Sequence, residues 1–560
     1  MLLCKLNWGI ISRMYHATTP VAAAASATVS NIRPDAFYSI NTENPPLAKS
    51  FYVGIFNTNV FNLKVKATEV LSSSNLFGVK VPKHFGGTEL SVTEISNAFK
   101  AIGLKNYKHY LAHGSVVQCI TKHGSDEQKT KFLPLLASGE NVATFCAYES
   151  QHGYDVENTS TKASFINGKW VINGTKSWVV NAKKSDVLLV LAKTMDECNR
   201  PESKMEFFSA FLVKKSSNGV KIIDNGSYSD VIFDNVQVDS MLGLENEGLL
   251  CHSILFTADF IESASATVGE LKKITKSFSE DFITNNQLKL LKLGKINSIL
   301  YSMDCVLHFT SLILDSYKTE TEYEQILARI FVTESTYACL DLLNDLGLPK
   351  TAYSYIEDSL LFDGRGTLLS IVGSLLGIQH AGQFMANEVK QLRNPLMFPK
   401  YTLSHIAKIQ SSLKDKPKLK QYIERYLHPS LKKQALDLEY CLSRIQFAVQ
   451  NMFINLGPDT CHYQMILERI NSVALNTYAM SAILHNVSGH LSSKNSQIYP
   501  TELVHASVFC NNARAHCSKT VTEILDAPNN VTDPLYKLLG QQIFVDKDYY
   551  LEHPLKRNIV

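Results

Sequence analysis

The sequence lacks a strong excess of charge and any paired-cysteine motif. Its formal net charge is only +3 over 560 residues, which argues against nucleic acid as the main partner because a basic footprint is missing. Eleven cysteines are scattered without a CxxC spacing. The nearest approach to a metal motif is Cys510 with His516 and Cys517, and we expect buried, reduced thiols there rather than zinc.

Long apolar runs are also missing, and so are acids at the start of the chain. No uninterrupted apolar run reaches about 18 residues, so we expect no transmembrane helix. The first acid is Asp35, after a stretch that is rich in Ser, Thr and Ala and contains Lys5, Arg13 and Arg33. This composition predicts a mitochondrial transit peptide over residues 1–34. A secretory signal is the rival interpretation, but Arg13 interrupts its short apolar run.

The spacing of apolar residues along the chain changes twice. Residues 45–141 are mostly helical in pattern, and Ser125 with two following acids predicts a helix start. Residues 142–245 are short β-rich runs, which predict a small antiparallel sheet or barrel. The dipeptides Asn167-Gly168 and Asn173-Gly174 predict tight hairpin turns within it. Helical spacing returns over 246–389 and continues through a last block, 390–560.

Residues 390–433, hereafter the basic segment, are rich in lysine and poor in acid. Two interpretations stay open. The segment is either a solvated, partly flexible connector or an amphipathic basic surface that contacts an anionic membrane.

Two motifs carry a family resemblance. The run GSDEQKTKFLPLLASGENVATFCAYES (124–150) and the run INGTKSWVVNA (172–182) resemble the acyl-CoA dehydrogenase family, which has G-x-x-E-Q-K-x-x-x-L-P-x-L-A-x-G-E and N-G-x-K-x-W-I-T-N. PPLAKSFYVG (45–54) and the helical block after 390 resemble the large members, the very-long-chain enzyme and member nine. GIQHAG, HPSL, NTYAMSAIL and the terminal HPLKR look most like member nine. The family has more helix after Phe61 than this chain.

The resemblance implies an α+β fold. It comprises a transit peptide (1–34), a shortened N-terminal helical domain (45–141), a middle β-barrel domain (142–245), a C-terminal four-helix bundle (246–389) and an extra C-terminal helical domain (390–560). It also implies FAD, held between the β domain and the helices, and a carboxylate base that removes a proton from an acyl-CoA thioester.

The phrase FDGRGTLLS places Asp363 where the family has a glutamate base. Such a base must reach the substrate carbon and have a raised pKa in a dry pocket. Aspartate is shorter by one methylene, and a displacement of about 1 Å costs on the order of 10²-fold in rate. We interpret Asp363 as a relic of the base.

Other positions that the family uses for FAD also depart from its pattern. Tyr148 and Tyr154 replace a threonine and a serine, and Val180 replaces the threonine after the retained Trp178. The family's Q-x-x-G-G-x-G is here DLLNDLG, which removes close glycine approach and adds acid beside a pyrophosphate. Ala258-Asp259 and Asn285–Leu288 replace two further motifs. The candidate cofactor positions are Phe145, Ala147, Tyr148, Tyr154, Trp178, Val180, Asp341, Asn344 and Asp345.

The resemblance to member nine implies an assembly factor of respiratory complex I, on the matrix side of the inner mitochondrial membrane. We expect a homodimer that binds partner assembly factors and that holds FAD weakly or not at all. Two alternatives stay open: an active FAD-dependent long-chain acyl-CoA dehydrogenase that uses Asp363, and an acyl-CoA binder without redox chemistry.

Overall fold

The computed structural model divides the chain into two compact units, each built from separate stretches of sequence. Unit 1 comprises 1–41, 64–318 and 335–364, and unit 2 comprises 42–63, 319–334 and 365–560. The structure describes residues 47–64, 76–104, 110, 112–153, 158–195, 206–226, 228–239, 241–258, 260–278, 286–317, 321–356, 367–492, 500–526 and 532–546.

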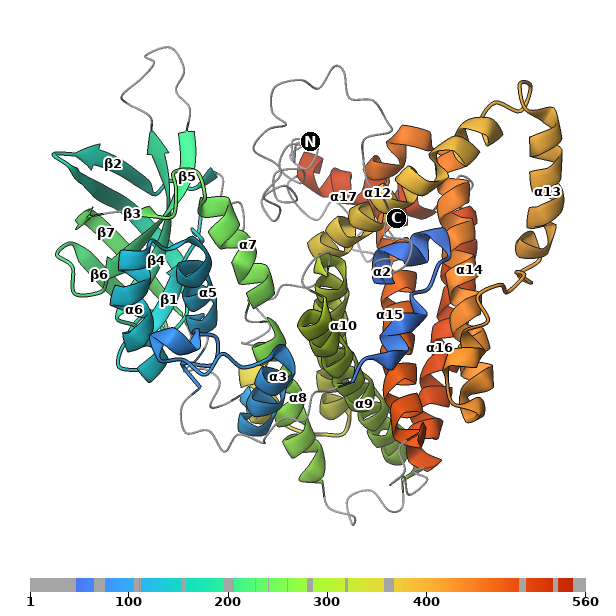
Figure 1. The fold of residues 1–560 in the computed structure, drawn as a ribbon, viewed down its shortest axis with the longest axis horizontal. Coiled ribbons are helices and arrows are strands. Elements are labelled where there is room, and N and C mark those ends of the chain that lie inside the picture. The colour runs from blue at the N-terminus through green and yellow to red at the C-terminus, as the bar shows by residue number, and fades with distance from the viewer. Residues whose placement is uncertain are drawn as a thin grey trace, which may run out of the picture. The chain divides into compact units, whose positions relative to one another are not determined.

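An eight-stranded sheet forms one part of unit 1 (Figure 1). Its strand order is β6-β7-β3-β2-β4-β5-β8, with β1 paired to β4. Buried residues lie on both faces: one cluster packs against helices and the other is formed by the strands themselves. The strands are β1 (Ala143–Cys146), β2 (Lys162–Ile166), β3 (Lys169–Val179), β4 (Val187–Met195), β5 (Glu206–Lys214), β6 (Val220–Asp224), β7 (Ser229–Val238) and β8 (Met241–Leu242).

The prediction of a small antiparallel sheet or barrel is confirmed for most strand pairs, but β1 and β2 each run parallel to β4. The first predicted hairpin is confirmed. Asn167 and Gly168 both have positive φ, 52° and 78°, in the tight turn between β2 and β3.

The second predicted turn was wrong, because Asn173 and Gly174 lie inside β3 at a bulge in its pairing with β7. Gly174 has φ 149°, and a Cβ there would lie 2.6 Å from Thr161 Oγ1. Close approach of Thr161, the residue before β2, and not a chain reversal, is therefore what requires this glycine.

Helices of unit 1 cover the sheet and form a separate bundle. Helix α5 packs on β1 and α7 packs on β5, while α3 packs against α8 and α9. Helix α6 begins with a capping box in which Ser125 and Gln128 bond each other's backbone N–H, so the predicted helix start is confirmed. The bounds are η6 (Lys83–Phe85), α3 (Val92–Ile102), α5 (His113–His123), α6 (Asp126–Ser138), α7 (Gly248–Ala258), α8 (Phe260–Lys276), α9 (Gln287–Ser316) and η9 (Lys350–Ala352); α10 (Glu322–Asp345) contributes to both units.

Unit 2 is helical, and an early segment of the chain packs among its late helices. Tyr52 and Tyr323 share a hydrogen bond between their hydroxyls (2.9 Å), and Tyr323 also donates to Asn471 Oδ1 (3.1 Å). The bounds are α2 (Leu47–Ser50), η4 (Phe51–Val53), η5 (Thr58–Asn62), α12 (Thr367–Leu392), α13 (Pro399–Leu413), η10 (Ile423–Tyr426), η11 (Pro429–Leu431), α14 (Lys432–Asn455), η12 (Gly457–His462), α15 (Gln464–Ser492), α16 (Pro500–Leu525) and α17 (Thr532–Asp546).

One described helix, α9, is long and apolar enough to cross a membrane by length and composition alone. Within its most apolar window, 67% of the residues are buried in the protein, as in the core helix of a soluble protein. The bounds of the five segments expected from the sequence stay predictions.

Candidate functional site

The ends of β1 and β3 meet, and they bring together two of the predicted groups of site residues. The Ser177 N–H donates to the Tyr148 carbonyl oxygen (2.9 Å). The Thr144 hydroxyl donates to the Val180 carbonyl oxygen (2.6 Å). Phe145, Ala147 and Tyr148 of the first motif therefore lie beside Trp178 and Val180 of the second, and we call this region the strand-end site.

Trp178 is held in an unusual backbone conformation at the strand-end site. Its φ is +57°, a left-handed value that costs free energy for a bulky side chain. The pairing of β3 with β7 is irregular between Lys176 and Val179, which allows this conformation. The indole is 43% exposed, so its ring presents an accessible apolar face.

Tyr148 packs against a buried histidine. Its ring meets the ring of His252, on α7, edge to face at 5.8 Å between centroids. His252 is buried, and burial, reinforced by the nearby Lys176 charge, lowers the pKa of its imidazole to about 4. The imidazole is therefore neutral at physiological pH, and the pair is an aromatic contact at the edge of the apolar core.

A buried ion pair lies directly behind the strand-end site. Lys176 Nζ is 3.0 Å from Glu149 Oε1, and both side chains are almost fully buried. Lys176 also donates to the Ala147 carbonyl oxygen (3.0 Å) and to Thr159 Oγ1 (2.6 Å). The other contacts of the Glu149 carboxylate come from residues 159–161. The hydroxyls of Thr159 and Thr161 (2.6 Å for Thr161) and the backbone N–H groups of residues 160 and 161 (2.7 and 3.0 Å) all donate to it.

These contacts shift both pKa values. Burial alone would raise the pKa of Glu149, but the Lys176 charge and the hydrogen bonds from Thr159, Thr161 and the residue 160 backbone outweigh it and hold the pKa well below its usual range. Burial lowers the pKa of Lys176, and Glu149 limits that drop. The charges of Lys176 and Glu149 therefore compensate each other inside the protein, and the contacts of the two side chains link the end of β1, β3 and the start of β2.

The remaining predicted site residues do not join the strand-end site. Asp341, Asn344 and Asp345 are exposed at the C-terminal end of α10, where Asp345 pairs with Lys292 of α9 (3.0 Å). Among the described residues, no hydrogen bond or ion pair links these three to β1 or β3. Asp363 and Tyr154 lie outside the described residues.

Sequence reasoning missed His252 and the Lys176–Glu149 pair. A signal for Lys176 did exist, since side chains alternate along a strand and Lys176 shares the inward face of β3 with Ile172. A lysine at an inward position needs a buried anion. His252 gave no such signal, because nothing in the local pattern of α7 selects it.

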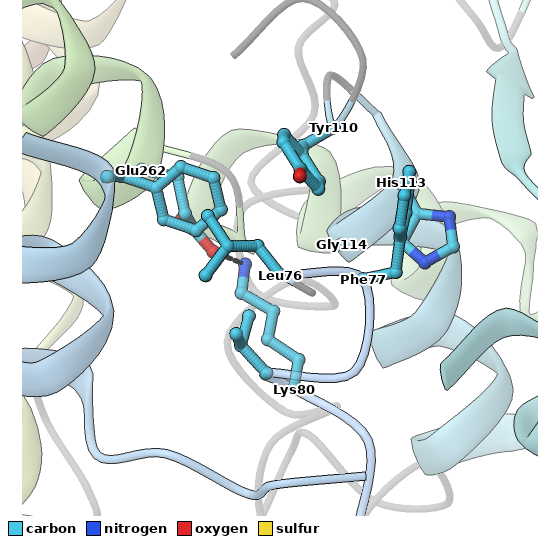
Figure 2. A pocket seen from close by; sticks show the side chains of 9 residues that line it. Leu76, Phe77, Lys80, Tyr110, His113, Gly114 and Glu262 are labelled. Carbon is cyan, nitrogen blue, oxygen red and sulfur yellow. Dashed lines mark ion pairs between the residues drawn. The ribbon is translucent and has the colours of Figure 1, made fainter. Parts of the chain in front are cut away.

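A second buried ion pair borders a small cavity elsewhere in unit 1 (Figure 2). Lys80 pairs with Glu262 of α8, and both side chains are buried. Tyr110, His113 and Phe77 complete the wall, and the cavity holds about 10 Å³, room for one water molecule. As it stands, it admits no organic ligand.

Comparison with known proteins places these features in a family. The N-terminal domain of acyl-CoA dehydrogenases matches residues 55–140, and the middle domain of the same enzymes matches residues 144–240. The ACAD9/ACADV C-terminal domain matches residues 429–549. The three matches follow one another in the expected order. The chain belongs to the acyl-CoA dehydrogenase family.

Individual relatives agree with this assignment. The very long-chain specific acyl-CoA dehydrogenase of Bos taurus, a mitochondrial protein, is 24% identical over 495 residues, which are 82% of this chain and 75% of the relative. The mitochondrial isovaleryl-CoA dehydrogenase of Solanum tuberosum is 30% identical over 233 residues, 38% of this chain and 54% of the relative. A solved acyl-CoA dehydrogenase from Bacillus anthracis, complexed with FAD, has the same fold, with a TM-score of 0.65 and 21% identity over 85% of each chain. The predicted α+β fold with its extra C-terminal helical region is confirmed.

Several polar groups of the strand-end site are engaged within the protein. The carbonyl oxygens of Tyr148 and Val180 already accept hydrogen bonds from within the protein. The Glu149 carboxylate is satisfied by Lys176 and the loop that follows it. Val180 offers a buried isopropyl group where a hydroxyl would serve. The Trp178 ring is exposed and offers an apolar face for stacking.

Proposed function

We propose that the chain is a non-catalytic member of the acyl-CoA dehydrogenase family that serves in the assembly of respiratory complex I. In this proposal it acts as a homodimer with partner assembly factors, on the matrix side of the inner mitochondrial membrane. FAD is the cofactor that the family would supply, and this chain holds it weakly or not at all.

The observation that carries the proposal is the internally satisfied strand-end site. Its polar groups bond one another, and Tyr148 packs on His252 instead of leaving a small hydroxyl free. Replacing a hydroxyl by Val180 removes a donor that a polar ring would need, and an unpaired buried polar group costs about 1–3 kcal/mol. A protein that has lost such groups keeps its fold because the core does not depend on them.

Two findings support the proposed mitochondrial location and the proposed likeness to the large members of the family. The very-long-chain relative is mitochondrial by its printed description. The C-terminal match is to a domain shared by ACAD9 and ACADV, the large members of the family. A scaffold needs a stable fold and a partner surface, and it needs neither a base nor a cofactor.

Flavin content tests the loss of chemistry directly. The purified full chain, saturated with FAD and desalted, should show little absorbance near 450 nm. Tyr148→Thr combined with Val180→Thr restores both hydroxyls and is the matched variant in the same assay. A yellow wild-type protein with one flavin per chain would contradict the proposal and favour the active dehydrogenase.

Rescue of cells that lack the protein tests the assembly role. Asp363→Ala should restore complex I to the level that the wild-type chain gives. If Asp363→Ala accumulates normally and fails to restore complex I, the enzymatic alternative is favoured. If the flavin-free chain binds long-chain acyl-CoA in solution and Asp363→Ala fails, the non-redox binder is favoured.

A further inference from the structure

Sulfur-bearing side chains gather in the interior of unit 2, where α14, α15 and α16 pack together (Figure 1). Cys441 lies on α14, Met480 lies on α15, and Cys510 and Cys517 lie on α16. Each of the four side chains is at most 1% exposed. Three helices therefore bring thiols and a thioether together in a place that water does not reach.

The nearest approach to a metal motif in the sequence, Cys510 with His516 and Cys517, does not assemble. His516 Nε2 instead lies 2.8 Å from the Ser472 hydroxyl oxygen on α15. Among the residues that the structure describes, no three His, Cys, Asp or Glu side chains are grouped so as to hold a metal ion. A structural zinc site takes four ligands, mostly thiolate and imidazole, which this set does not supply.

Cys441 makes sulfur contacts with two other helices. Its thiol lies 3.9 Å from the Met480 thioether, measured between the sulfur atoms, and it shares a side-chain hydrogen bond with Cys517. We call these three residues the three-sulfur cluster. Three sulfurs bound about 2.3 Å from one ion in a trigonal plane lie about 4 Å from one another. The distance between Cys441 and Met480 is therefore that of two ligands of one ion.

The ligand types in the three-sulfur cluster select a soft ion. Thiolate and thioether together suit Cu(I), whereas hard cations require oxygen ligands. A disulfide switch has less support, because the hydrogen bond with Cys517 and burial both raise the pKa of the Cys441 thiol. Thiol–disulfide exchange requires an accessible thiolate, and Cys441 is both protonated and buried.

We propose that the three-sulfur cluster binds one Cu(I) ion, with Cys441 and Cys517 as thiolate ligands and Met480 as the thioether ligand. The ion displaces the two thiol protons, so the complex carries one net negative charge. Arg514, which also pairs with Asp437 (2.6 Å), places a positive charge near Cys441. Because the sulfurs are buried, the ion enters as the helices assemble or when they open locally. This inference goes beyond the proposed function and does not depend on it.

The copper content of the full chain tests the site. The protein is expressed in copper-supplemented cells, purified without oxygen and measured by inductively coupled plasma mass spectrometry. The wild type should hold about one copper ion per chain, and Cys441→Ala should hold only background copper. Cys510→Ala is the matched control, because it removes an equally buried thiol that lies outside the three-sulfur cluster, and it should keep its copper.

Competition with bathocuproine disulfonate, a Cu(I) chelator, tests the thioether ligand. Met480→Leu conserves the apolar volume and should weaken Cu(I) binding at least about tenfold, since even an outer partner of a metal site is worth that much. Met452→Leu is the control, because Met452 is a buried methionine about three turns further along α14, and it should leave the affinity unchanged. Thermal unfolding of each variant separates lost binding from lost fold.

Each other outcome decides against the site. A wild-type chain without copper after loading in cells would overturn the proposal. Equal copper in Cys441→Ala would assign the metal to other side chains, and equal affinity in Met480→Leu would remove the third ligand. Stoichiometric zinc in place of copper would refute the selection of a soft ion. The flavin and rescue tests of the proposed function are unaffected by all of these results.

Discussion

Replacing Lys176 by methionine should destabilise the β domain far more than replacing an exposed lysine. The methionine keeps the length of the side chain and leaves the Glu149 carboxylate buried without a counter-charge. Removing one partner of a buried ion pair costs about 3–5 kcal/mol of unfolding free energy. Lys169→Met is the control, because Lys169 and Asp239 form an exposed pair (3.7 Å) that is worth less than about 1 kcal/mol.

Urea unfolding followed by tryptophan fluorescence is the assay. Two of the three tryptophans, Trp170 and Trp178, lie in β3, so the signal reports on the sheet. The double variant Lys176→Met with Glu149→Gln removes both charges and should be more stable than Lys176→Met alone. If Lys176→Met unfolds within about 1 kcal/mol of Lys169→Met, the ion pair is not what holds the strand ends together.

The pH dependence gives the same pair a second readout. In the wild type the folded pKa of Glu149 lies below its unfolded value of about 4.3, so the contribution of the pair is complete above that pH and is lost as the pH falls below it. Without Lys176, burial raises the pKa of the carboxyl, and protonation relieves the penalty. The stability gap between wild type and Lys176→Met should therefore narrow as the pH falls from 7 to 5. A gap that widens over this range would contradict the electrostatic account.

Three further predictions use the same protein. Gly174→Ala should destabilise the sheet by more than Gly168→Ala in the urea assay, because a Cβ added at Gly174 would strike Thr161. A Cβ added at Gly168 meets open space, so only the left-handed backbone costs free energy there, about 1–2 kcal/mol. Equal destabilisation in the two variants would remove the close-approach argument. Ser125→Ala should cost about 1 kcal/mol by opening the capping box of α6, measured by thermal unfolding, and a neutral effect would show that the cap is redundant. Asp363→Glu should not raise turnover of long-chain acyl-CoA in a dye-reduction assay; ordinary enzymatic rates in that variant would refute the loss of the cofactor site.

The two motifs that the sequence analysis selected lie side by side in the structure. Each motif ends a strand, and the hydrogen bond from Ser177 to Tyr148 joins those ends in space. The turn at Asn167-Gly168 was also predictable, since a tight hairpin depends on local backbone preference alone.

The errors and omissions have a common physical origin. Asn173-Gly174 has the same local preference, but the close approach of Thr161, the residue before β2, decides its structure. The contact between His252 and Tyr148 joins residues about a hundred positions apart, and no local pattern encodes it. Tertiary contacts overrode the turn propensity of Asn173-Gly174, and a tertiary contact also brought His252 to Tyr148.

The discontinuous construction of unit 2 has a consequence for the order in which the chain folds. Tyr52 lies 271 positions before its hydrogen-bond partner Tyr323, and the Glu324 carboxylate accepts the backbone N–H of Ala48 across 276 positions. Residues 42–63 therefore leave the ribosome, or enter a compartment N-terminus first, long before the helices that receive them exist. When synthesis reaches residue 364, all of unit 1 has been made, but the last helices of unit 2 have not. Until those helices form, apolar side chains such as Phe51, which is buried in the folded protein, stay uncovered. Apolar surface that stays exposed during that interval favours aggregation.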